Sequence, residues 1–449
     1  MKRVAFSILL ACGSAPQPAP KTAPPAPTIV AIPAPAPARD VGDDVRAREF
    51  IDKLVHRDFA GASVPFSDAM HSAMPPDKLE LLWAQMQQQL GSFATVDGIE
   101  VKLESGMSIA LVTTSFELKK VVVRVVFSSD HHIAGLSILP VPWQPPAYAT
   151  PDAFEEREVS IGNPALPGTL TLPKGAQHVP AIVLVHGSGP GSRDEVMGSI
   201  EVFHDLAWGL ASRGIAVLRY DKRSLVHPEG VRTQKDEVDD AAHAAIALLR
   251  AQPEVDASRI ALLGHSQGGN LAPRIAKADP AIKRLVIFAG STQPLEDSIL
   301  MQMRYFKTME PNEPKLDEMI TKAEQFKAAI VNPKLKPDDA IENPFGGHAF
   351  TGAYFLDVRD YHPERVAAKL TIPILVLQGE RDYQVSPTVD FARWKTALGH
   401  NKNVTFHTYP GLTHAFNVGE GPPGPSDYGK PAHVDAHVID DIAAWCSGR

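Results

Sequence analysis

The sequence predicts an α/β protein with a mostly parallel sheet and a helical cap, preceded by a small α+β domain. Three observations support this class. From residue 154 to the end, β-branched apolar runs alternate with amphipathic segments of helix length. Before that alternation come two amphipathic helices and then several strands in succession. The length of 449 residues is enough for two or three domains.

The composition excludes several classes of protein. An apolar content of 44% and a charged content of 21% are typical of globular chains and exclude a wholly disordered or fibrous protein. Beyond the N-terminus there is no run of 18 apolar residues, which excludes a polytopic membrane protein. The net charge of -8 and the lack of a Lys/Arg cluster argue against a nucleic-acid partner. Two cysteines at opposite ends, Cys12 and Cys446, exclude a disulfide framework and a cysteine-based metal site.

Residues 1–12 are predicted to be a signal peptide. Lys2 and Arg3 precede an apolar run that ends in a small residue before Cys12. The sequence Leu9-Leu10-Ala11-Cys12 resembles a bacterial lipobox, which implies cleavage before Cys12 and acylation of its thiol. We therefore expect export and a lipid anchor in the bacterial cell envelope, on its periplasmic or outer-membrane face. The alternatives are an ordinary secretion signal, or an apolar tail on a cytoplasmic protein.

Residues 13–40 form a predicted disordered linker. Nine prolines fall between residues 16 and 37, interleaved with alanine. Because proline fixes φ and removes backbone donors, this segment is expected to be a semi-extended spacer. Such a spacer would suit a lipid anchor, and a linker without any function is the alternative.

Residues 41–142 are predicted to form the small α+β domain. Apolar residues recur at helical spacing over 45–56 and 76–90. Strands are expected at 96–103, 107–116, 121–127 and 133–139. This order resembles the small NTF2-like domain of unknown function. His131 and His132 are adjacent in the last turn, and neighbouring residues point apart, so we expect a solvated turn and no metal site.

The second domain is predicted over residues 154–449, after a proline-rich boundary at 140–146. Its apolar runs indicate parallel strands, which predicts a functional site beyond their carboxyl ends. The runs are 181–185, 215–218, 260–263, 285–288, 374–377 and 404–409.

The strongest motif is Gly264-His265-Ser266-Gln267-Gly268-Gly269, between a strand and a helix. A serine on such a sharp turn is exposed as a nucleophile, and the glycines leave room for the turn. Ser266 is the predicted nucleophile, and Gly264, His265 and Gly268 belong to its turn. A glycine-rich turn that carries a serine by chance is the alternative.

Two further strand ends supply candidate groups. After residue 185 comes His186-Gly187-Ser188-Gly189-Pro190, whose glycines allow backbone N–H groups to face a ligand; it lacks the spacing of nucleotide-binding loops. After residue 378 stand two acids, Glu380 and Asp382, and after residue 409 stands His414. The order serine, acid, histidine is that of the α/β-hydrolase triad.

The motifs HGSGPGSRDE, YDKR, GHSQGG, LQGERDYQV and YPGLTHAF resemble those of bacterial α/β-hydrolase-fold esterases, in the branch related to dienelactone hydrolase and prolyl oligopeptidase. The NTF2-like domain precedes the hydrolase domain in some of these esterases. The resemblance implies Asp382 as the acid in preference to Glu380. It also implies an oxyanion hole made by the backbone N–H groups of Ser188 and Gln267. Where the family often reads YDKRG, this chain continues with Ser224, so the loop is altered.

The function implied is hydrolysis of carboxylic esters, with short to medium acyl chains, through an acyl-enzyme. The expected partner is a small-molecule ester, with no metal and no organic cofactor. A peptidase, thioesterase or lactone hydrolase uses the same fold, and a non-catalytic envelope-binding module is the remaining alternative. The oligomeric state is not predicted.

An insertion over about 291–368 is predicted to form a helical cap above the site. Amphipathic helices are expected at 295–308 and 316–329. The first contains four large side chains that suit either the core or an apolar inner wall of the cavity. These are Met301, Met303, Tyr305 and Phe306.

Overall fold

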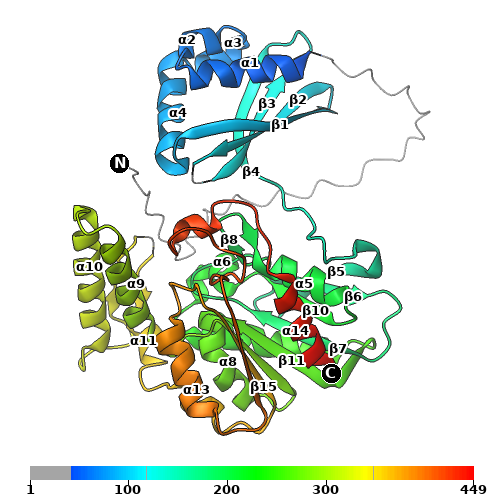
Figure 1. Cartoon of the computed structure of the whole chain (residues 1–449), viewed down its shortest axis with the longest axis vertical. Helices are drawn as coiled ribbons and strands as arrows, with labels where there is room; N and C mark the ends of the chain where they lie inside the picture. The colour runs from blue at the N-terminus through cyan, green and yellow to red at the C-terminus, as the bar shows by residue number, and fades with distance from the viewer. Residues whose placement is uncertain (1–41, 118, 347, 449) are drawn as a thin grey trace. The chain divides into compact units, whose positions relative to one another are not determined.

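The structure is a computed structural model that describes residues 42–117, 119–346 and 348–448. The chain forms two compact units, which meet in sequence between Trp143 and Gln144 (Figure 1). The predicted signal peptide and linker, residues 1–12 and 13–40, lie outside the described residues. Within the described ranges, no helix combines the length and the apolar character needed to cross a membrane.

The small unit packs four helices against one antiparallel sheet, and the expected α+β class is confirmed. The sheet order is β1-β2-β3-β4. Helices at 45–56 and 76–90 were predicted, but two helices of five and six residues between them are too short to show a helical period. The elements are α1 (Asp43–Val55), α2 (Phe59–Ser63), α3 (Asp68–Ala73), α4 (Pro76–Leu90), β1 (Phe93–Glu104), β2 (Met107–Phe116), β3 (Lys120–Phe127) and β4 (Ile133–Pro140).

The core of the small unit is apolar and rich in aromatic rings. The Trp83 ring lies 6.0 Å from that of Phe93 and 5.8 Å from that of Phe116, centroid to centroid. The two histidines of the β3–β4 turn have different partners. The Nδ1 of His131 lies 3.0 Å from Asp43, and that of His132 lies 3.0 Å from Asp130.

The large unit, which begins at Gln144, is built on an eight-stranded sheet of order β16-β15-β12-β11-β7-β10-β6-β5. Five neighbouring pairs, from β16 to β10, are parallel, and the two pairs at the β5 edge are antiparallel. The predicted mostly parallel sheet is therefore confirmed. The strands are β5 (Phe154–Ile161), β6 (Leu166–Pro173), β7 (Val179–Val185), β10 (Ala216–Tyr220), β11 (Val255–His265), β12 (Arg284–Phe288), β15 (Ile374–Gly379) and β16 (Val404–Tyr409).

The edge hairpin of β5 and β6 was not predicted. Strand β5 reads FEEREVSI and is exposed along most of its length, so it lacks the apolar run that identified the central strands. The central strands β7 and β11, by contrast, are buried on both faces, as expected for a parallel sheet.

Helices cover both faces of this sheet (Figure 1). Helix α5 packs with α14, while α7 and α8 contact β11. Short elements complete the loops. The helices are α5 (Val202–Ala211), α6 (Arg223–Val226), α7 (Asp240–Arg250), α8 (Gln267–Ala278), α12 (Pro363–Ala367), α13 (Ala392–Leu398) and α14 (Ala436–Ser447), and the short strands are β8 (Val196–Met197) and β9 (Ile200–Glu201). Cys446 is buried in α14, and this burial raises the pKa of its thiol to about 12, which makes it unreactive.

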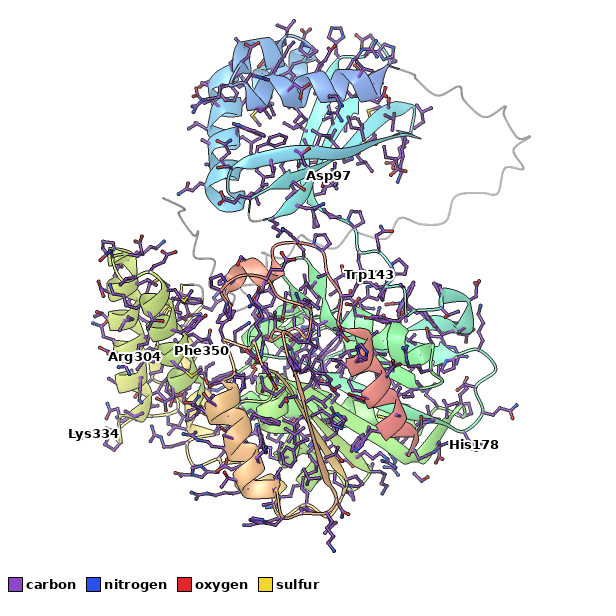
Figure 2. The ribbon with its side chains drawn as sticks, in the orientation of Figure 1. Asp97, Trp143, His178, Arg304, Lys334 and Phe350 are labelled. Atoms are coloured by element: carbon purple, nitrogen blue, oxygen red, sulfur yellow. The ribbon has the colours of Figure 1, made fainter. Side chains whose placement is uncertain are left out.

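The predicted cap lies between β12 and β15. Its two long helices, α9 (Leu295–Met309) and α10 (Pro314–Val331), lie side by side, as Figure 1 shows. The chain then returns through a two-stranded hairpin of β13 (Ala340–Ile341) and β14 (Phe350–Thr351) and the short helix α11 (Gly352–Leu356). Phe350, labelled in Figure 2, lies between the long cap helices and the rest of the large unit.

Candidate active site

Ser266 occupies a strained turn between β11 and α8. Its φ of +53° and ψ of -113° lie in a region that a residue with a side chain rarely adopts. A Cβ on Gly264 would lie 2.2 Å from the carbonyl oxygen of Gly268, and one on Gly268 would lie 2.3 Å from that of Val185. The motif glycines are therefore required by close backbone contacts, and the turn presents Ser266 at the carboxyl end of the sheet.

The loop after β7 lies directly beside this turn. A Cβ added to Gly187 would come within 3.2 Å of the Ser266 Cβ. Ser188 and Gln267, the predicted oxyanion donors, both line the same cavity as Ser266. The structure thus brings these three residues together in the wall of one cavity.

Asp382 and His414 form a buried hydrogen-bonded pair. The Nδ1 of His414 lies 2.7 Å from the Oδ2 of Asp382, an arrangement that in the neutral imidazole favours the tautomer with its proton on Nδ1. Asp382 also accepts from the backbone N–H groups of Gln384 and Val385, at 2.8 and 2.9 Å. These bonds hold the carboxylate still and keep the imidazole in one tautomer.

Glu380, the other acid considered for this position, points elsewhere. Its side chain is exposed and accepts a hydrogen bond from Thr408 at 2.7 Å. Asp382 is thus the acid of this loop that contacts His414.

A second buried pair, Glu195 and His265, ties three segments of the site together. The Oε1 of Glu195 accepts from the N–H of Gly187 at 2.9 Å and lies 3.0 Å from the Nδ1 of His265. The Nε2 of His265 lies 3.1 Å from the carbonyl oxygen of His414. Both ring nitrogens of His265 therefore have an oxygen partner, one from the Glu195 loop and one from the His414 loop.

The ionisation of Glu195 depends on this pairing. Burial by itself would raise the pKa of Glu195, but the hydrogen bonds from His265 and from the Gly187 N–H, together with the nearby His186, lower it to about 2. Glu195 is therefore a carboxylate at neutral pH, and it joins the Gly187 loop to the turn that carries Ser266.

A cavity of about 410 Å³ lies between the turn of Ser266 and the cap. Apolar cap residues form part of its wall, among them Leu295, Ile299 and Phe355. The four large side chains of α9 left open by the sequence are not in this wall. Met303 and Phe306 are buried in the core, and the Tyr305 hydroxyl donates to the carbonyl of Pro423 at 2.8 Å.

Two acidic residues of α9, Glu296 and Asp297, line the cavity. Glu296, in the first turn of α9, is 8% exposed and lines the cavity. Burial raises the pKa of Glu296, and the neighbouring negative charge of Asp297 raises it further. This acidic group makes the cavity wall less uniformly apolar than expected.

Sequence reasoning missed Glu195, Lys222, Glu237 and Tyr354, which are buried around the site. Glu195 and Lys222 stand in the motifs HGSGPGSRDE and YDKR, and charged residues at strand ends were the available signal. Glu237 lies in a helical segment and Tyr354 lies in the cap, and no local motif in the sequence identifies either residue. The predicted Cys12 lies outside the described residues.

Comparison with known proteins shows the family of the chain. Residues 176–420, more than half of the chain, match the family described as "Serine aminopeptidase, S33". The chain belongs to the serine aminopeptidase S33 family. This match identifies the chain as a hydrolase, and the mostly parallel sheet with helices on both faces agrees with the predicted fold. Residues 47–136 match a family of unknown function, DUF3887.

Two proteins are similar to this member of the S33 family in sequence. Esterase EstD of Thermotoga maritima is 33% identical over 408 residues, which covers 90% of this chain and 95% of EstD. Thiohydrolase apmlB of Arthrinium phaeospermum is 32% identical over 98 residues, 21% of this chain and 31% of that protein. Among solved structures, Est1E of Butyrivibrio proteoclasticus has a TM-score of 0.43 at 17% identity and covers 65% of this chain and 99% of its own.

Proposed function

We propose that the protein is a serine hydrolase that cleaves carboxylic esters, with Ser266 as nucleophile, His414 as general base and Asp382 as the acid that orients the histidine. The observation that carries this proposal is the buried hydrogen bond of 2.7 Å between His414 and Asp382. Both residues follow strands at the carboxyl end of the sheet, the end at which Ser266 stands on its strained turn. The resemblance to Esterase EstD over 90% of the chain supports the choice of ester bonds.

In the proposed mechanism, the Nε2 of His414 takes the proton of Ser266 as its oxygen attacks the ester carbonyl carbon. The oxyanion that forms accepts hydrogen bonds from the backbone N–H groups of Ser188 and Gln267. Collapse of the tetrahedral intermediate expels the alcohol, which receives the proton from His414 and leaves an acyl-serine. Water, deprotonated by His414, then attacks the acyl-enzyme and releases the acid and free Ser266.

The cavity supports short to medium acyl groups as substrates. A volume of about 410 Å³ is at the lower end of the range of small-molecule sites. Its wall combines apolar cap side chains with polar residues such as Asn270 and Gln302. A long alkyl chain would leave several of these polar groups without water, which costs free energy.

The proposal is tested with p-nitrophenyl esters of increasing acyl length. We expect Ser266→Ala to lower kcat by roughly 10⁶-fold, since loss of the nucleophile removes the acyl-enzyme path. A fluorophosphonate probe is expected to label the wild type and not this variant. The matched control is Ser298→Ala, a nearby serine of the cavity wall, which should still be labelled. Labelling of the Ser266→Ala protein would overturn the assignment of the nucleophile.

Cleavage of amides next to a free amino group is a second candidate, favoured by Glu296. Its carboxyl group lines the cavity and is largely withdrawn from water. A substrate ammonium group could pair with it there. Aminoacyl p-nitroanilides in the same panel separate the two functions, because an esterase alone would leave them intact.

We also propose that the protein is exported and anchored through an acylated Cys12. The charged and apolar residues before Cys12 and the proline-rich segment after it support this. Labelled palmitate should be incorporated by the wild type in a bacterial host and not by Cys12→Ser. An unlabelled wild type would contradict the anchor.

A further inference from the structure

A buried lysine connects the two backbone segments to which the oxyanion hole is assigned. Lys222, 1% exposed, donates from Nζ to the carbonyl oxygens of Gly187 and Gly189, at 2.7 and 3.1 Å. It also donates to the Oε1 of Gln267 at 3.0 Å. Its ammonium group therefore spans the loop that carries Ser188 and the residue that follows Ser266.

The charge of Lys222 is balanced by a buried acid. The Oε1 of Glu237 lies 3.2 Å from the lysine Nζ, and Glu237 is 4% exposed. Its Oε2 accepts the hydroxyl proton of Tyr354 at 2.6 Å. Burial and the carboxylate of Glu237 raise the pKa of Tyr354 well above its usual value, so the hydroxyl keeps its proton and donates.

Tyr354 completes a closed cycle of hydrogen bonds. The same hydroxyl oxygen accepts from the Nε2 of Gln267 at 2.9 Å, while Gln267 accepts from Lys222 at its Oε1. The cycle thus runs Lys222, Glu237, Tyr354, Gln267 and back to Lys222. Three of its members belong to the strand-end loops and helices of the sheet, and Tyr354 is supplied by α11 of the cap.

We propose that Tyr354 is a positioning residue of the oxyanion hole, which acts through the side chain of Gln267 and through Glu237 and Lys222. The inference rests on the proposed function, because it takes the N–H groups of Ser188 and Gln267 as the oxyanion donors. Tyr354 itself is absent from the cavity wall among the described residues, whereas its neighbour Phe355 is in it. Its effect on the reaction must therefore be indirect.

Tyr354 affects the rate because the two backbone N–H groups of the oxyanion hole must point in a fixed direction. Donors of an oxyanion hole contribute only if they are already aimed at the position of the developing charge. The side chain of Gln267 is anchored at both ends of its amide, by Lys222 and by Tyr354, which limits rotation of the residue that bears one donor. Removal of the hydroxyl would leave Glu237 and Gln267 each with one buried polar contact fewer, and such networks respond as a unit.

The cap therefore does more than cover the cavity. A cap that shifts away from the sheet would take Tyr354 with it and open the cycle. The donors would then be correctly placed only with α11 in its present position, next to the aromatic rings of Phe350 and Phe355, 5.1 and 5.3 Å from that of Tyr354.

The test is Tyr354→Phe in the full chain, assayed with a p-nitrophenyl ester. This change removes one oxygen and keeps the ring in its aromatic cluster. We expect kcat to fall by about 10-fold, less than for loss of a direct oxyanion donor, with KM unchanged because the donors act mainly in the transition state. A substitution that only weakened the fold would lower the melting temperature and leave kcat per folded molecule intact.

The matched control is Tyr409→Phe. Its hydroxyl also donates to a carboxylate, Asp441, at 2.8 Å, but between β16 and α14 and outside the cycle. It is expected to lose a similar amount of stability with no change in kcat.

A double-mutant cycle identifies the route. Gln267→Met keeps the backbone N–H and removes the amide side chain, so its effect on kcat should overlap with that of Tyr354→Phe. The double variant is expected to be no slower than the slower single variant. Fully multiplicative effects would exclude action through Gln267.

The two proposals fail in different ways. If Ser266→Ala retains activity, the proposed function is wrong. If activity depends on Ser266 but Tyr354→Phe leaves kcat within twofold of the wild type, or raises only KM, the positioning role is wrong and the proposed function stands.

Discussion

The two units of the chain differ in what they bury. In the core of the small unit the buried polar residues are few, and they include Asp43, Ser108 and Thr114. The large unit buries charged and titratable groups at the carboxyl ends of its strands, where Glu195 and Lys222 stand beside the turn of Ser266. Its apolar core, by contrast, fills the interior of the sheet and the helix contacts, as in any α/β domain.

This difference indicates that the function lies in the large unit. Taking a charge out of water costs several kcal/mol unless partners compensate it, so a fold does not bury charges without a reason. In the small unit, the buried Asp43 pairs with Arg46 and His131 away from any described cavity, whereas the buried ions of the large unit are explained by the geometry that they impose on three loops. Substitutions in the two units should therefore have different consequences for catalysis and for stability.

The largest effect after loss of the nucleophile is expected at Asp382. Asp382→Asn keeps the shape but presents an amide to His414, which favours the wrong tautomer, and kcat should fall by about 10⁴-fold. Steady-state kinetics with a p-nitrophenyl ester measure this. The control is Glu380→Gln, two residues away at the same strand end, whose exposed carboxylate contacts only Thr408 among the contacts described and whose loss should leave kcat unchanged. An equal loss in both variants would contradict the assignment of the acid.

A smaller and pH-dependent effect is expected at Glu195. The folded protein lowers the pKa of Glu195 from 4.5 to about 2. A lowered carboxyl pKa contributes stability that is present above the unfolded value and is lost as the pH falls from about 4.5 towards 2. The pairing is worth roughly 3 kcal/mol at neutral pH, so Glu195→Gln should be less stable than the wild type at pH 7, by a margin that shrinks at pH 3.

Urea unfolding at both pH values checks this expectation. Glu155→Gln is the control, because its carboxylate pairs with Arg157 at the exposed surface, and it should change the free energy of unfolding by less than about 0.5 kcal/mol. A difference between Glu195→Gln and the wild type that stays constant between pH 7 and pH 3 would contradict the ionised state of Glu195.

The smallest effect on catalysis is expected in the small unit. Trp83→Ala removes a buried ring from its core and should destabilise that unit by about 3 to 5 kcal/mol, with kcat unchanged. Calorimetry and ester hydrolysis below the unfolding temperature measure the two quantities. A fall in kcat at that temperature would mean that the small unit contributes to the reaction and that the contrast between the units is wrong.

Much of the fold was predictable because it rests on local patterns. Apolar runs bounded by turns identified the central strands, and helical periods identified α1, α4 and the cap helices. The edge strand β5 was missed because a strand exposed on most of its residues carries no apolar run. Helix α2 was missed because five residues are too few to show a period.

The part of the site that consists of short continuous motifs was predictable from the sequence. Ser266 and its glycines form one continuous segment, and the close backbone contacts of Gly264 and Gly268 explain why that segment has this composition. Asp382 was preferred to Glu380 only through the family resemblance, because both acids follow the same strand. Their different partners arise from the path of the loop that carries His414.

By itself, therefore, the sequence determined the fold class, the turn of Ser266 and the order of the candidate triad, since each depends on residues that are neighbours in the chain. Only the tertiary structure showed the contact between His414 and Asp382, which the family resemblance had implied, and the groups that surround the loop of Ser188. Tyr354 and Glu237 are 117 residues apart in the chain, yet their oxygens lie 2.6 Å apart. Such a pair is created by the packing of the cap onto the sheet, and no local period or motif records it.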